Sequence, residues 1–287
     1  MMTRTRGLVL AVVLLFSSCA PGATPATSPK ALEEGIDYRL DVRSEPRPLR
    51  IHHIRVDLGV GRWQLVAALS GDPDGAGPAT GELEPPTTIA QRHGGVVLIN
   101  ANPWQSTLDA SGKRSTNWRQ GMHVEILGLA ASDGKVRSAP TTQNCSVWTD
   151  PAGRVNIGSP PDPSSVREGV AGFGRLLDGG RIVPEAGGPI HPRTALGLDS
   201  QRKALHLVVV DGRQAGYSEG MPLRELAQLM RDLGCWDAAN LDGGGSSIMM
   251  VRQGADWRVV NDPSTKRDGA SVARPIPTAL VIRRHKS

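Results

Sequence analysis

The sequence predicts an α+β fold: a single domain in which mixed β-sheets of many short strands are joined by a few packed helices. The 287 residues include 34 glycines and 22 prolines but only six Trp, two Tyr and two Phe. This composition favours many turns and short strands over a helical bundle. After residue 36, no segment resembles a linker long enough to divide the chain into two domains. Residues 36–287 are therefore expected to form one domain.

Short apolar runs bounded by turn residues mark the expected strands. Ile54, Val56 and Leu58 alternate with other residues, which predicts a half-buried strand over residues 49–58. Further strands are expected at residues 63–70, 96–99, 124–130, 170–177, 195–198, 204–210, 248–251 and 278–282. A short helix is expected at residues 87–93, and an amphipathic helix is expected to begin after Pro222 and end at Gly234.

Asparagine twice follows a helix, a glycine stop and an apolar strand, first as Asn100 and later as Asn240. We expect the two strands to be neighbours whose ends converge on one cleft. Chance recurrence of a common supersecondary pattern is the alternative.

The N-terminus carries the features of an export signal. Arg4 and Arg6 precede an apolar run over residues 7–16 that is too short to span a bilayer, and small residues then lead to Cys19. Residues 1–18 are predicted to be a signal peptide. Residues 16–19, Phe-Ser-Ser-Cys, resemble a bacterial lipobox, although Phe stands where Leu is usual.

The lipobox resemblance implies that Cys19 becomes the lipidated first residue of the mature protein; simple cleavage and release is the alternative. Residues 19–35, which begin rich in Pro, Ala, Thr and Ser, are expected to form a flexible tether. The predicted location is outside the cytoplasm, in the cell envelope, with the membrane reached through the lipid.

Two further cysteines, Cys145 and Cys235, remain in the expected domain. In an exported protein such a pair forms a disulfide or stays as two buried thiols, and the sequence leaves both open. Neither cysteine has metal-ligand spacing, and the adjacent His52 and His53 point to opposite faces of a strand. No cofactor and no metal site are expected, although clustered Asp and Asn side chains leave a divalent cation open. The basic residues lack interleaved aromatics, so no nucleic-acid partner is expected.

The candidate site centres on residues 240–247, Asn-Leu-Asp-Gly-Gly-Gly-Ser-Ser. Consecutive glycines weaken helices and strands, but they let backbone approach a ligand and turn its N–H groups inward as an anion-binding nest. The candidate ligand-binding groups are Gly243, Gly244, Gly245, Ser246 and Ser247. A tight hairpin is the alternative. Because a strand is expected at residues 248–251, no helix dipole is expected to assist this loop.

The order of motifs resembles the phosphodiester glycosidase family. The resemblance rests on His-Pro-Arg-Thr-Ala-Leu-Gly at residues 191–197, the strand into Asp211-Gly212, the amphipathic helix and the Gly-rich segment. It spans residues 50–284 and implies a hydrolase acting on a glycosyl phosphodiester or a related envelope or exopolysaccharide linkage. Residues 100–104, Asn-Ala-Asn-Pro-Trp, stand where many relatives have an Asn-Gly-Gly-Phe-like turn, which implies a reshaped cleft wall.

Cleaving a sugar-1-phosphodiester on the sugar side needs a carboxylate, as base or nucleophile, and positive or N–H groups for the phosphate. Asp242 and Asp211 are the candidate carboxylates, Arg193 suits bidentate phosphate recognition, and Asn240 completes the candidate catalytic set. Asn100, His191 and Thr194 are further candidate substrate-binding residues. A turn role for Asp211, an ion pair for Arg193 and loop-stabilising roles for the amides and His191 are the alternatives.

Two other functions remain open. A metal-dependent phosphodiesterase would cut the P–O bond instead of the sugar bond. A non-catalytic envelope lipoprotein would bind a glycan through the same Gly-rich loop.

Overall fold

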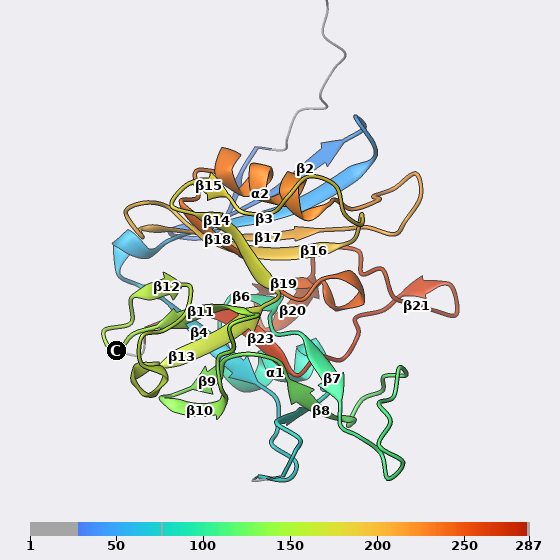
Figure 1. Cartoon of the computed structure of the whole chain (residues 1–287). Coiled ribbons are helices and arrows are strands. Elements are labelled where there is room, and N and C mark those ends of the chain that lie inside the picture. The colour runs from blue at the N-terminus through green and yellow to red at the C-terminus, as the bar shows by residue number, and fades with distance from the viewer. Residues whose placement is uncertain (1–27, 76, 286–287) are drawn as a thin grey trace, which may run out of the picture.

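The computed structural model describes residues 28–75 and 77–285. Its largest element is an eight-stranded sheet, here called the large sheet (Figure 1). In spatial order its strands are β1 (Lys30–Glu33), β2 (Ile36–Arg43), β3 (Leu49–Asp57), β17 (Ala204–Val210), β16 (Arg193–Leu198), β18 (Asp237–Asn240), β14 (Gly174–Asp178) and β15 (Arg181–Ile182).

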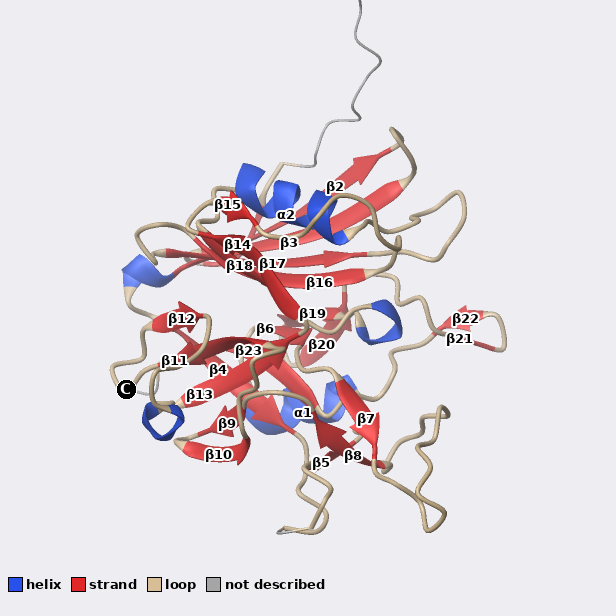
Figure 2. Ribbon diagram, in the orientation of Figure 1, coloured by secondary structure: helices blue, strands red, loops and turns tan. Residues whose placement is uncertain are grey.

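Two five-stranded sheets form the layer that faces the large sheet (Figure 2). The first contains β20 (Asp256–Val259), β19 (Met249–Gln253), β6 (Val97–Asn100), β23 (Thr278–Arg284) and β4 (Trp63–Leu69). The second contains β10 (Lys135–Ser138), β9 (Ala130–Ser132), β13 (Glu168–Gly172), β11 (Cys145–Thr149) and β12 (Val155–Ile157).

Smaller elements surround these layers. A three-stranded sheet contains β5 (Gly81–Glu82), β8 (His123–Ile126) and β7 (Trp104–Ser106), and β21 (Lys266–Arg267) pairs with β22 (Ala270–Ser271). The helices are α1 (Pro86–His93) and α2 (Leu223–Asp232), with 3-10 turns at η1 (Leu58–Val60), η2 (Pro163–Ser165) and η3 (Gly244–Ser246).

The main core lies between the large sheet and the facing layer. Alternation places Ile54 and Val56 of β3 in this core, whereas Leu49 and Ile51 lie on the opposite face of the sheet. That opposite face is covered by α2, which buries Leu226, Ala227, Leu229 and Met230 (Figure 1). A third cluster lies under α1. The protein is therefore a β-sandwich with one helix outside each layer.

The predicted α+β fold class is confirmed, and every strand pair among the described residues is antiparallel. The strand expected at residues 170–177 is broken at Phe173 into β13 and β14, which belong to different sheets. The segment expected as one strand at residues 124–130 is likewise divided between β8 and β9, with Gly128 at a φ of 76° between them. Periodicity alone could not show these crossings between sheets.

The two strands that end in Asn100 and Asn240 are not neighbours. β6 belongs to the facing layer and β18 to the large sheet, so the prediction of adjacent strands is wrong. Their ends nevertheless meet across the sandwich, because the side chain of Asn100 donates to the carbonyl of Asp242 over 2.6 Å. The convergence is between layers and not within a sheet.

Two further expectations are corrected by the structure. The tether expected over residues 19–35 includes β1, which pairs with β2, so regular structure begins at Lys30 and not at Ile36. Cys145 and Cys235 are free, buried thiols that lie in separate clusters, Cys145 in the main core and Cys235 beneath α2, so they form no disulfide. Cys19 and the predicted signal peptide lie outside the described residues. No helix within the described ranges has the length and apolarity needed to cross a membrane.

Candidate active site

The Gly-rich loop follows β18 and is held from the facing layer by Asn100. The Asn100 amide nitrogen donates to the Asp242 carbonyl, and its oxygen accepts from the Ile248 amide over 3.1 Å. The same oxygen accepts from the Thr194 hydroxyl over 2.8 Å. One buried amide therefore fixes both ends of the loop and ties it to β16.

We expect Asn100→Ala to lower the free energy of unfolding by at least about 3 kcal/mol, because three buried hydrogen bonds lose their partner. Urea unfolding measures this change. Asn117→Ala, at an exposed position, is the matched control and is expected to lie within about 0.5 kcal/mol of the parent protein. A loss of less than about 1 kcal/mol for Asn100→Ala would contradict the clamping role.

A cavity of about 280 Å³, here called the Asp242 pocket, opens beside this loop. It lies where β16 begins, β18 ends and the chain enters β14. Its lining residues are Phe173, His191, Arg193, Arg213, Asn240, Asp242, Gly243, Gly244, Gly245 and Arg274.

Asp242 is the only carboxylate among these lining residues. Burial raises the pKa of Asp242 to about 6, although Ser246, Arg274 and the Gly243 amide each act to lower it. The Arg274 guanidinium lies 3.7 Å from the carboxylate and also donates to the Ser246 hydroxyl. A carboxylate with this pKa is ionised at neutral pH and remains basic enough to take a proton, which suits a general base.

Three arginines, Arg193, Arg213 and Arg274, line the same pocket as this one carboxylate. Arg193 donates from Nε to the Met221 carbonyl and from Nη2 to the Pro189 carbonyl, which orients it without neutralising it. Burial lowers the pKa of Arg193 and of Arg274, and the charge of Arg213 lowers both further. The pocket therefore carries uncompensated positive charge, which is the electrostatic arrangement that an anion would relieve.

Two side chains at the pocket each carry one buried polar atom without a hydrogen-bond partner among the described residues. The Oδ1 atom of Asn240 and the Nδ1 atom of His191 are buried without a hydrogen bond in the described structure. Burial, followed by the charges of Arg213 and Arg193, lowers the pKa of His191, so its imidazole is neutral at pH 7. Unpaired buried polar atoms cost free energy and mark positions that a polar ligand or water would satisfy.

The structure brings together most of the predicted site residues, but not all of them. Asp242, Asn240, Arg193, His191 and the three glycines of the loop line one pocket. Asn100 and Thr194 lie in the interior and bond each other. Ser246 lies just outside the lining and bridges Asp242 to Arg274, whereas the buried Ser247 hydroxyl has no partner in the described structure.

Asp211 does not line the pocket. Its carboxylate accepts from Asn261 Nδ2 over 3.1 Å and from the Asp262 amide over 3.0 Å, and it bonds His52 Nε2 over 3.1 Å. Asn261 also donates to the Ser247 carbonyl. Asp211 is thus a buried anchor for the far end of the loop, and the two predicted carboxylates do not form a catalytic pair.

The expected nest of inward-facing N–H groups is not formed. The Gly244 amide donates to the Pro192 carbonyl, the Ser246 amide donates to the Gly243 carbonyl, and the Gly243 amide lowers the pKa of Asp242 by bonding its carboxylate. Gly244 has a φ of 58°, and a Cβ there would lie 3.1 Å from Arg213 Nη2. The glycines therefore bring backbone close to arginine, and the arginines supply the positive charge.

Sequence reasoning missed three lining residues: Phe173, Arg213 and Arg274. Arg213 follows the Asp-Gly turn and has a positive φ of 59°, which is strained for a residue with a side chain and typical of functional positions. Arg274 stacks over Trp104, with its guanidinium carbon 5.2 Å from the ring centroid. The departure from the family turn at residues 100–104 thus reaches the pocket through Arg274. No group of three or more His, Cys, Asp or Glu side chains in the described ranges is placed to hold a metal ion.

Comparisons with known proteins identify the family and the fold. The family model for phosphodiester glycosidases matches residues 89–283. The fold is similar to the catalytic domain of zebrafish N-acetylglucosamine-1-phosphodiester alpha-N-acetylglucosaminidase, auto-inhibited by its pro-peptide, with a TM-score of 0.62 at 22% identity over 93% of this chain and 85% of that one.

It is also similar to a hypothetical protein from Synechocystis, with a TM-score of 0.56 at 16% identity over 92% of this chain and 64% of that one. A search among curated proteins gives no match. Because the family model covers more than half of the sequence, the chain belongs to the phosphodiester glycosidase family of hydrolases.

Proposed function

We propose that the protein hydrolyses a glycosyl phosphodiester at the Asp242 pocket by breaking the bond between the anomeric carbon and the phosphate oxygen. The observation that carries this proposal is a pocket lined by three arginines and by one buried carboxylate of raised pKa. Arg193, Arg213 and Arg274 would hold the phosphodiester anion, and Asp242 would act at the sugar.

The chemistry requires only one carboxylate. Asp242 takes a proton from water as the water oxygen bonds to the anomeric carbon, or it attacks that carbon itself before water releases the sugar. The bond to the phosphate oxygen breaks, and its electron pair leaves with the phosphate monoester. This leaving group is a phosphate monoester dianion, whose conjugate acid has a pKa of about 6, far below that of a sugar hydroxyl, so it needs little protonation. The position of Asp211 outside the pocket is therefore compatible with the proposed reaction.

Hydrolysis in H₂¹⁸O tests which bond breaks. The first substrate would be an N-acetylglucosamine-1-phosphodiester, the class named for the zebrafish enzyme, within a panel of other sugars. We expect the label in the released sugar. Label in the phosphate would instead establish cleavage of the P–O bond, and binding across the panel without turnover would establish a glycan-binding role.

The pH dependence of kcat/KM is a second check on the role of Asp242. Because this carboxylate must be ionised to act and its pKa is about 6, kcat/KM is expected to fall about tenfold per pH unit below pH 6. Arg274→Gln is expected to shift this acidic fall in kcat/KM to higher pH, since Arg274 lowers the pKa of Asp242. A fall in kcat/KM that begins only near pH 4 in the parent protein would contradict the assignment.

We further propose that the protein is exported and anchored in the cell envelope through Cys19, where it acts on a surface glycan. The support is the n-region, the short apolar run and the lipobox-like residues 16–19. Incorporation of labelled palmitate by the parent protein and its loss in Cys19→Ser would establish the anchor. Equal labelling of both would contradict it.

A further inference from the structure

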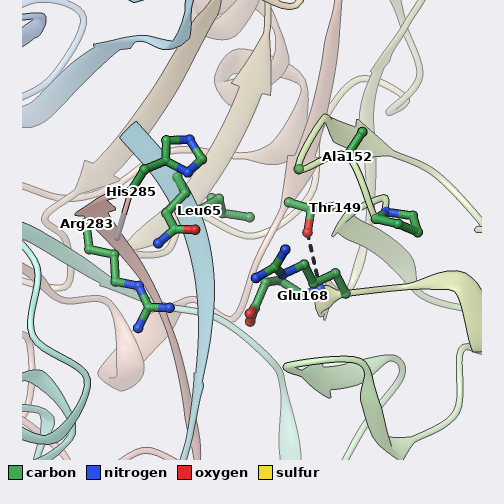
Figure 3. A pocket seen from close by; sticks show the side chains of 10 residues that line it. Leu65, Thr149, Ala152, Glu168, Arg283 and His285 are labelled. Atoms are coloured by element: carbon green, nitrogen blue, oxygen red, sulfur yellow. Dashed lines mark hydrogen bonds between the residues drawn. The ribbon is translucent and has the colours of Figure 1, made fainter. Parts of the chain in front are cut away.

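A second cavity, of about 330 Å³ and here called the Glu168 cavity, lies between the two sheets of the facing layer (Figure 3). Leu65, Arg283 and His285, from β4 and the end of β23, lie on one side of it. Thr149, Ala152 and Glu168 lie on the other. No residue is shared with the lining of the Asp242 pocket.

The two cavities lie at opposite ends of the same strands. In β13, Glu168 lines the Glu168 cavity, whereas a Cβ on Gly172 would lie 2.0 Å from the Asn240 carbonyl, beside the Asp242 pocket. In β23, Arg283 lines the cavity, whereas Thr278 accepts from the Asn102 amide near the loop. At about 3.3 Å per residue, the length of β23 separates the sites by roughly 15–20 Å.

Two guanidinium groups, those of Arg167 and Arg283, line the Glu168 cavity, and the charge of Arg283 lowers the pKa of Glu168. Neither Arg167 nor Arg283 is ion-paired within the described part of the chain. The Nε atom of Arg283 is in addition buried without a hydrogen-bond partner. A buried N–H on a charged group is costly when it is unpaired, so this position favours an anionic oxygen from a ligand.

Glu168 provides a different kind of contact. Its side chain is buried. Oε2 accepts from the Ala67 amide over 2.9 Å and from the Ser132 hydroxyl over 3.4 Å, and Oε1 accepts from the Asp133 amide over 3.4 Å, which leaves part of its accepting capacity unused. Burial raises the pKa of Glu168, and the bonds from the Ala67 and Asp133 amides and the charge of Arg283 oppose that rise. A carboxylate fixed at the wall of a polar cavity accepts hydrogen bonds from ligand hydroxyl groups.

A neighbouring cavity of about 530 Å³ shares Arg283 and is also lined by Arg252 and by Arg284, which pairs with the lining residue Glu33 over 2.7 Å. The basic surface therefore continues beyond the first cavity, and a ligand longer than one sugar unit has room to extend along it.

We propose that the Glu168 cavity is a second ligand site, separate from the Asp242 pocket, that binds an acidic saccharide. A ligand carboxylate or phosphate would bind Arg167 and Arg283, and an adjacent sugar hydroxyl would donate to Glu168. This site does not depend on the reaction proposed for the Asp242 pocket.

The Arg283 Nε–H resonance in the NMR spectrum of the full chain provides a direct test, with its assignment made by its disappearance in Arg283→Lys. Glucuronate is the charged sugar probe, and glucose is the neutral sugar probe. Inorganic phosphate is the anionic probe that has no sugar ring. We expect glucuronate to shift this resonance saturably and glucose at the same concentration to leave it unchanged. Arg167→Gln is expected to weaken glucuronate binding at least tenfold.

Arg154→Gln is the matched control, because Arg154 lies on the adjacent β11–β12 turn, is 78% exposed and is paired with Asp150. This variant is expected to bind glucuronate with the same affinity as the parent protein. The proposal is overturned if glucuronate causes no shift, if glucose causes an equal one, or if Arg167→Gln binds as the parent does. A response to phosphate without one to glucuronate overturns the saccharide assignment.

Discussion

Asp242→Asn is expected to reduce hydrolysis of a glycosyl phosphodiester at least about 10³-fold, because the asparagine amide can neither accept the proton from water nor attack the anomeric carbon. Asparagine has nearly the same shape, and the loop is held through the Asp242 backbone by Asn100, so the fold is expected to persist. Initial rates at pH 7.5 measure the loss. Retention of even a tenth of the activity would contradict the assigned role.

The same substitution is expected to stabilise the protein. The pKa of Asp242 is about 6 in the folded protein, against 3.8 for an aspartate in an unfolded chain, so the folded state binds more protons between these values. The stability that comes from protonated Asp242 is fully present below pH 3.8 and is lost as pH rises through 6. Asparagine avoids this loss, which amounts to about 3 kcal/mol at pH 7.5.

Urea unfolding at pH 7.5 and pH 4 tests the sign. The gain from Asp242→Asn is expected at pH 7.5 and should shrink towards pH 4. Asp211→Asn supplies the opposite case, because its buried carboxylate accepts from Asn261 and Asp262 and bonds His52. It is expected to lose about 2–4 kcal/mol. If both variants changed stability in the same direction, the distinction between a reactive and an anchoring carboxylate would fail.

Arg213→Gln is expected to raise KM about 10- to 150-fold, the equivalent of losing one charged hydrogen bond of about 1.5–3 kcal/mol to the phosphodiester. In the free protein, however, Arg213 repels its neighbours: its charge lowers the pKa of His191, Arg193 and Arg274. The free protein is therefore expected to be at least as stable without Arg213 as with it.

Arg202→Gln is the matched control for this substitution. Arg202 also has a positive φ, of 56°, but it lies in the turn between β16 and β17 and bonds Asn156. Its loss is expected to leave KM unchanged. An unchanged KM for Arg213→Gln, or a marked loss of stability, would assign Arg213 to the fold and not to anion binding.

The sequence predicted the parts of the site that are contiguous in the chain. Asn240, Asp242 and the three glycines form a single strand exit, and His191 and Arg193 belong to a second short motif. Local motifs are retained as units when the chain folds, so their residues were found together. The strands 204–210 and 278–282 and both helices were also predicted well. The strands are marked by apolar runs, α1 by the glycines that end it, and α2 by its apolar face.

The errors concern contacts between distant segments. Asp211 was predicted to be catalytic, but its environment is set by His52 from β3 and by Asn261, neither of which its own motif reveals. Arg274 reaches Asp242 only because the chain before β23 returns across the sandwich. The loop amides were assigned to a ligand, yet the entry to β16 supplies the carbonyl that occupies one of them. The spacing of residues within a single sequence does not predict these contacts between distant segments.

The two free cysteines of the described residues, Cys145 and Cys235, make opening of the sandwich measurable by chemical labelling. Burial raises the pKa of Cys145 to about 11 and that of Cys235 to about 12, so a thiol reagent reacts with either only when the surrounding structure opens. Cys145 belongs to the core between the two layers, whereas Cys235 lies beneath α2. Their labelling rates therefore report separately on opening of the layers around the active site and on detachment of the outer helix.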